Sequence, residues 1–145
     1  MSKKLRDTWI LLARSTLGIM FSTSGWGKIA NPEKFNTDFQ NWGVPLSDIS
    51  APATAWAELV LGTLLTVGVL TRIAAIGLTA TMIGAITYAT FPSILNTTST
   101  AFGFMSSFFY SSEWLLTLIL TTIIYTGAGQ ISIDRALRGE TPLND

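Results

Sequence analysis

Long apolar segments constrain the fold of this chain more than any other feature. Four of them stand out, at about residues 8–28, 52–70, 73–91 and 113–127. Each approaches the length of about 20 mainly apolar residues that a transmembrane helix needs. Charged residues make up only 12% of the 145-residue chain, against roughly 25% in soluble domains. We therefore predict an all-α fold, a four-helix transmembrane bundle, with residues 1–145 as a single domain.

The residues between these segments support the boundaries. Pro52 is acceptable at the start of a helix, and Thr71-Arg72 leaves only a very short turn, which predicts an antiparallel hairpin of the second and third spans. Pro92 is expected to end the third span, and Gly127 to end the fourth.

Basic residues predict the orientation of the bundle, because cytoplasmic loops of membrane proteins carry an excess of Lys and Arg. The loop between the first two spans is mixed in charge, and the loop before the fourth span has no basic residue. Both termini should therefore face the cytoplasm, and the chain is expected to be a multi-pass protein of a bacterial or archaeal cytoplasmic (inner) membrane. We expect the first segment to be a retained span. The basic residues on the cytoplasmic side are Lys3, Lys4, Arg6, Arg72, Arg135 and Arg138.

The sequence contains no His and no Cys, which excludes several chemistries. It has no thiolate for a metal or iron–sulfur cluster and no imidazole for a haem or a Ser–His triad. We therefore expect no haem, iron–sulfur or metal ligands. A net charge of zero gives no reason to expect nucleic acid as a partner. Any redox function must come from a diffusible cofactor or from another subunit.

Two ionisable residues lie well inside the predicted spans. Arg14 is near the inner end of the first span and Glu58 near the outer end of the second. At 1.5 Å per residue in a core of about 30 Å, their depths differ by roughly 12 Å, so a direct ion pair between them is not expected. Glu58 is closer in depth to Lys28 and Tyr88, and Asp134 is the natural counter-ion of Arg14. An ionisable group in a span costs about 2.5–3.5 kcal/mol and usually faces the bundle interior.

The segment 91–110 is rich in Phe and carries no charge. It is either an interfacial segment on the outer leaflet or an aromatic cover over an entrance for a hydrophobic ligand.

Several motifs together resemble those of the DoxX family of small bacterial and archaeal membrane proteins. They span nearly the whole chain in the family's order. Ala128 stands where the family pattern has Pro. The motifs are Leu12-Ala13-Arg14, Ser24-Gly25-Trp26-Gly27-Lys28 with Pro32, Gly43-Val44-Pro45, Glu58-Leu59-Val60-Leu61-Gly62, Gly68-Val69-Leu70-Thr71-Arg72, Glu113 with Leu115, and Gly127 to Asp134.

The resemblance implies a four-helix membrane bundle and a quinone-linked role, since the family is named from a subunit of a thiosulfate:quinone oxidoreductase. In that role Glu58 is the candidate catalytic residue, as proton carrier or headgroup contact. Trp26, Lys28, Tyr88 and Glu113 are the candidate quinone-binding residues, with Glu113 linking the site to the outer aqueous phase.

Arg14, Arg72 and Asp134 are predicted to form a cytoplasmic-side polar cluster that fixes the bundle or docks a partner. The predicted partners are the lipid bilayer and a redox-active subunit that supplies electrons; self-association is a further option.

Two other functions stay open at the level of sequence. In the first, the chain is a structural or assembly subunit of a larger membrane complex, and its polar residues only hold the helices together. In the second, it is a small proton-coupled transporter that uses Glu58. No inverted repeat is visible in the sequence, which disfavours the second function.

Overall fold

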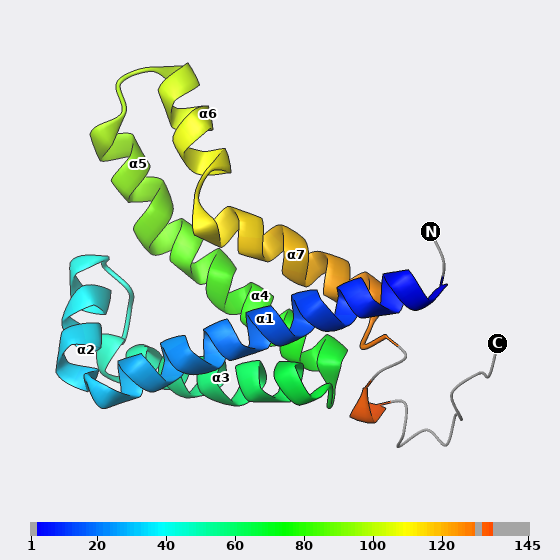
Figure 1. The fold of residues 1–145 in the computed structure, drawn as a ribbon. Coiled ribbons are helices and arrows are strands. Elements are labelled where there is room, and N and C mark those ends of the chain that lie inside the picture. Colours follow the sequence, from blue (N-terminus) through cyan, green and yellow to red (C-terminus); the bar gives the residue numbers. More distant parts are fainter. Residues whose placement is uncertain (1–2, 130–131, 135–145) are drawn as a thin grey trace.

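The computed structural model describes residues 3–129 and 132–134, and no strand occurs in that part of the chain. The helices follow one another closely and differ widely in length (Figure 1). They are α1 (Lys3–Ala30), α2 (Pro32–Asn41), α3 (Ser47–Val67), α4 (Thr71–Ala85), the π-helical segment η1 (Ile86–Thr90), α5 (Phe91–Thr97), α6 (Ala101–Phe109) and α7 (Ser112–Thr126).

Helices α1 and α3 lie side by side over most of their length (Figure 1). Glycines make this approach possible: a Cβ atom at Gly62 would lie 2.6 Å from the backbone nitrogen of Ser22, and one at Gly18 would lie 2.6 Å from that of Thr66. Small residues at helix contacts are typical of membrane helices, because close backbone approach increases van der Waals contact.

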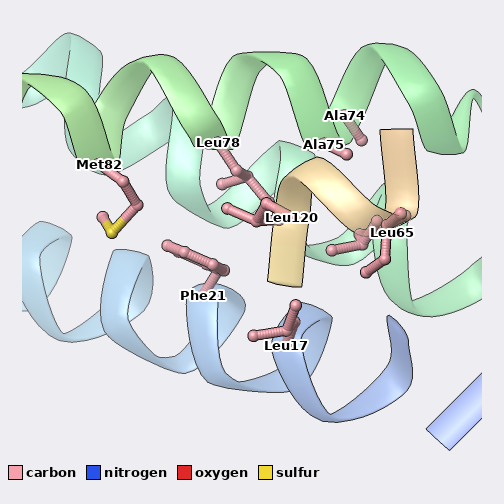
Figure 2. Packing of buried hydrophobic residues seen from close by; sticks show 9 residues of the cluster. Leu17, Phe21, Leu65, Ala74, Ala75, Leu78, Met82 and Leu120 are labelled. Atoms are coloured by element: carbon pink, nitrogen blue, oxygen red, sulfur yellow. The ribbon is translucent and has the colours of Figure 1, made fainter. Parts of the chain in front are cut away.

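Side chains from α1, α3, α4 and α7 meet in one apolar core. Phe21 of α1, Leu78 of α4 and Leu120 of α7 are buried there, as Figure 2 shows. Helix α4 packs on both α3 and α7, so the hairpin predicted around Thr71-Arg72 is present. The all-helical fold that the sequence predicted is therefore present, and four of its helices contribute to one core.

The prediction that Pro92 ends the third helix is wrong. The helix runs from Thr71 to Thr97 as one candidate span of 27 residues. It passes Pro92 through the π-helical turn η1, and Pro92 itself stands at the start of α5. A proline has no N–H to donate, and local π adjustments allow membrane helices to continue past one.

The second predicted helix begins earlier than expected, since α3 starts at Ser47 and Pro52 lies inside it. The loop before it also contains a helix that was not predicted. Helix α2 begins at Pro32, a residue that suits the first turn of a helix. It buries Phe35 and Phe39 against α3.

Within the described residues, two helices are long and apolar enough to cross a membrane, namely α3 and the continuous helix from Thr71 to Thr97. Helices α6 and α7 make a third candidate if they are one span bent by 51°. Helix α1 is not among these candidates, so the four-span bundle with cytoplasmic termini stays a prediction. The beginning of α1, the α3–α4 turn and the end of α7 do lie at the same end of the molecule (Figure 1).

Candidate functional site

A buried ion pair joins α1 to α3. The ammonium nitrogen Nζ of Lys28 donates to both carboxylate oxygens of Glu58 at 2.5 Å, and the hydroxyl of Ser24 donates to Glu58 Oε2 at 3.0 Å. The side chain of Glu58 is 3% exposed, whereas that of Lys28 is 26% exposed. Of the two side chains, Lys28 is therefore the one that is accessible from outside the protein.

This pair forms part of the wall of a cavity of about 680 Å³. Tyr88 in η1 and Glu113 in α7 also line the cavity. Four of the five residues predicted for the site, taken from four different elements, thus surround one space. The fifth, Trp26, is not among the lining residues and is 64% exposed, so the structure does not bring it to the cavity.

The rest of the cavity wall is mostly apolar. It includes Phe21 and Met82 from the core, and Phe35, Phe39 and Trp42 from helix α2 and its end. This aromatic wall was not predicted from the sequence. A signal was present, since Phe35, Phe39 and Trp42 are spaced by four and three residues behind a proline, which is typical of one face of a short helix.

The predicted cytoplasmic-side cluster lies around Arg14, near the middle of α1 and beside the C-terminal end of α3. Arg14 is 2% exposed, and its guanidinium packs on Gly68, where a Cβ atom would lie 1.7 Å from Arg14 Nη1. The negative charge of Asp134 acts on Arg14. Gly68 has a positive φ of 76°, a conformation in which glycine carries no steric penalty.

Asp134 also binds the beginning of α4. One carboxylate oxygen accepts from the backbone N–H of Leu70 at 2.7 Å, and the other accepts from that of Thr71 at 2.9 Å. The backbone N–H of Asp134 donates to the carbonyl of Gly68 at 2.9 Å. Asp134 therefore caps a helix more than sixty residues away, at the end where the helix dipole favours negative charge.

Arg72 shares a surface cavity of about 430 Å³ with Asp134. Its guanidinium lies near the turn at Gly127, where a Cβ atom would be 3.4 Å from Nε. The three residues predicted for this cluster thus lie at one end of the molecule.

Comparisons with known proteins identify the family of the chain. The DoxX family model matches residues 9–91, more than half of the chain. The chain belongs to the DoxX family. This DoxX protein is 32% identical to the inner membrane protein YqjF of Escherichia coli over 93% of its own length and 96% of that protein's.

A second relative is an uncharacterized membrane protein of Mycobacterium tuberculosis. This DoxX protein is 33% identical to it over 53% of its own length, and the match spans about half (48%) of the relative. No solved structure gives a significant match. The names of both relatives support the conclusion that this chain is a membrane protein, and neither name mentions a ligand.

Within the described residues, this DoxX protein has no group of three or more Asp, Glu, His or Cys side chains that could hold a metal ion. The charged groups that line its central cavity include the ion pair of Lys28 and Glu58, and most of the cavity wall is apolar. Such a cavity suits an apolar ligand with a polar head, because the few polar groups fix its orientation.

Proposed function

We propose that this DoxX protein is the quinone-binding subunit of a membrane redox complex, with the cavity beside Glu58 as the quinone site. One observation carries the proposal: a single cavity gathers Lys28, Glu58, Tyr88 and Glu113 within a largely apolar wall. These are the groups that binding a quinone headgroup requires.

The residues present fit such a ligand. The cavity volume of about 680 Å³ lies within the range of about 300–1,000 Å³ that is typical of small-molecule sites. A quinone has two carbonyl oxygens on opposite sides of its ring and needs donors on two walls. Lys28 supplies a donor from α1, and Tyr88 and Ser112 supply donors from η1 and α7.

A bound quinone is reduced by two electrons and two protons. In this protein Lys28 orients a carbonyl oxygen and holds a proton next to it, and Glu58 keeps the ammonium in place and accepts or returns a proton. The apolar wall excludes bulk water, which strengthens both interactions. The electrons come from a flavin, haem or metal centre of a partner subunit, because this chain has neither His nor Cys to hold a centre of its own.

Quinone binding to the purified protein tests this proposal. Trp42 lines the cavity, so decylubiquinone should quench tryptophan fluorescence with a saturable curve, and Trp42→Phe should remove most of the signal. Glu58→Gln and Lys28→Met should each weaken binding about tenfold, because a hydrogen bond to a charged group contributes about 1.5–3 kcal/mol. Quenching that never saturates, or that both variants leave unchanged, contradicts the proposal.

One observation favours the assembly-subunit function instead: the Lys28–Glu58 pair also connects α1 to α3. If that were its whole role, Glu58→Gln would lower the melting temperature and the amount of complex in the membrane but leave decylubiquinone affinity unchanged. Measuring melting temperature and affinity on the same variant separates the two functions.

A further inference from the structure

A second cavity adjoins the quinone site proposed above. It has a volume of about 330 Å³, lies between α1, α2 and the beginning of α3, and is called the vestibule below. Two residues, Lys28 and Phe35, line both the vestibule and the central cavity. These two side chains therefore form the partition between the two spaces.

The two side chains of this partition differ in polarity. Phe35 is 8% exposed and offers only a ring, whereas Lys28 places its ammonium 4.9 Å from the centre of that ring and bonds it to Glu58. An ammonium over an aromatic face is stabilised by the ring quadrupole. Lys28 is thus the polar group that crosses the partition, and Phe35 closes the space beside it.

The vestibule side of the partition carries acidic groups. Glu33 and Asp48 line it, and Asn36 Nδ2 donates to Asp48 Oδ1 at 2.8 Å. Both carboxylates belong to exposed residues, so they exchange protons with water. Glu33 belongs to α2 and Asp48 to the first turn of α3. Helix α2 lies at the end of the molecule opposite the α3–α4 turn (Figure 1), and this end is the predicted outer side.

We infer that Lys28 is a proton-transfer junction through which the central cavity takes up protons from the vestibule. This inference rests on the proposed quinone site. Reduction of one quinone to quinol takes two electrons from the partner's redox centre and two protons. Each proton passes from water or a vestibule carboxylate to Lys28, and from Lys28 directly or across Glu58 to a quinone oxygen. The ammonium and carboxylate are regenerated after every transfer.

A competing route runs through Glu113, which lines the central cavity from α7 but does not line the vestibule. The two routes lie on different elements, so separate variants test them.

Cysteine labelling tests the partition without any redox assay, because the natural chain contains no Cys. In spheroplasts, Lys28→Cys should react with both a membrane-impermeant sulfonated maleimide and the lipid-soluble N-ethylmaleimide. Thr81→Cys, in the central cavity alone, should react about tenfold faster with N-ethylmaleimide than with the sulfonated reagent. Lys34→Cys, on the exposed surface of α2, is the control for full aqueous access.

Removing the ring should open the partition. Phe35→Ala, or Phe35→Leu if the alanine variant does not accumulate, should raise the rate at which the sulfonated reagent labels Thr81→Cys by about tenfold. The inference is wrong if Lys28→Cys resists the sulfonated reagent, or if Thr81→Cys reacts with it as fast as Lys34→Cys before Phe35 is changed.

Turnover in native membranes tests the proton route. The double variant Glu33→Gln/Asp48→Asn should slow quinol formation about tenfold or more while decylubiquinone affinity stays within twofold, with Asp38→Asn as the control on the same helix. Slowing by Glu113→Gln and not by the double variant overturns the route. If the unaltered protein binds no quinone but the labelling pattern holds, the quinone function and the proton route both fail, and only the partition between the two cavities stands.

Discussion

The cap that Asp134 forms on α4 gives a prediction whose size follows from the structure. In Asp134→Ala, the backbone N–H groups of Leu70 and Thr71 lose their carboxylate acceptors at 2.7 and 2.9 Å. Arg14, which is 2% exposed, also loses the negative charge that acts on it. We expect α4 to fray at its first turn and the side chain of Arg14 to loosen from Gly68.

The expected loss of folding free energy follows from the two hydrogen bonds that Asp134 accepts. A hydrogen bond to a charged group contributes about 1.5–3 kcal/mol to stability, so two of them set a range of about 3–6 kcal/mol. Asp134 is partly exposed, which places the value near the lower end. We predict a loss of about 3 kcal/mol for Asp134→Ala and about 2 kcal/mol for Asp134→Asn, because asparagine retains one neutral acceptor.

Reversible unfolding in mixed micelles, followed by circular dichroism, measures this loss. Asp38→Ala is the matched control, since it removes a carboxylate at the opposite end of the molecule and should change stability by less than about 0.5 kcal/mol. The double variant Arg14→Met/Asp134→Ala should cost at least about 1 kcal/mol less than the sum of its single variants, because charges that act on one another couple. A loss below about 1 kcal/mol for Asp134→Ala, or strict additivity, refutes the reasoning.

Two further predictions concern helix packing. Gly62→Ala should force α1 away from α3 and cost about 1–3 kcal/mol, measured by the same unfolding assay. Gly27→Ala, where a Cβ meets nothing within 4 Å, should not destabilise; equal losses would contradict the packing argument. Phe108→Ala should loosen the α6–α7 corner, where its ring lies 5.1 Å from that of Trp114, and hydrogen exchange should rise in α6. The exposed Tyr110→Ala is its control, and no difference between the two variants would show that the rings do not hold the corner.

The parts of the fold that sequence predicted well are those governed by local pattern. Apolar runs and the short turn at Arg72 placed four long helices and the α3–α4 hairpin. Depth along the spans also separated the polar residues correctly, since Glu58 bonds to Lys28 while the charge of Asp134 acts on Arg14. Rise per residue is nearly constant in a helix, so depth is readable from the chain alone.

The parts that sequence missed depend on three-dimensional neighbours. Pro92 was read as a helix end because proline removes a donor, but the widened turn η1 lets the helix continue. Helix α2 was not predicted because it has only ten residues and is polar on one side. Without α2, neither the aromatic wall of the cavity nor the partition at Phe35 could be foreseen, although the residues near Glu58 could.

Two charged residues help to explain why α1 is less apolar than α3 and α4. It carries Arg14 and Lys28, and each is a charge that costs about 2.5–3.5 kcal/mol to place in a membrane span. Glu58 from α3 bonds to Lys28, and Asp134 acts on Arg14 from the far end of the chain. The position of α1 therefore depends on contacts that form only after α3 and the segment after α7 are in place. The side of α1 that carries these charges faces α3, with Gly62 in that helix and Gly68 at its end, and both candidate sites lie along this contact.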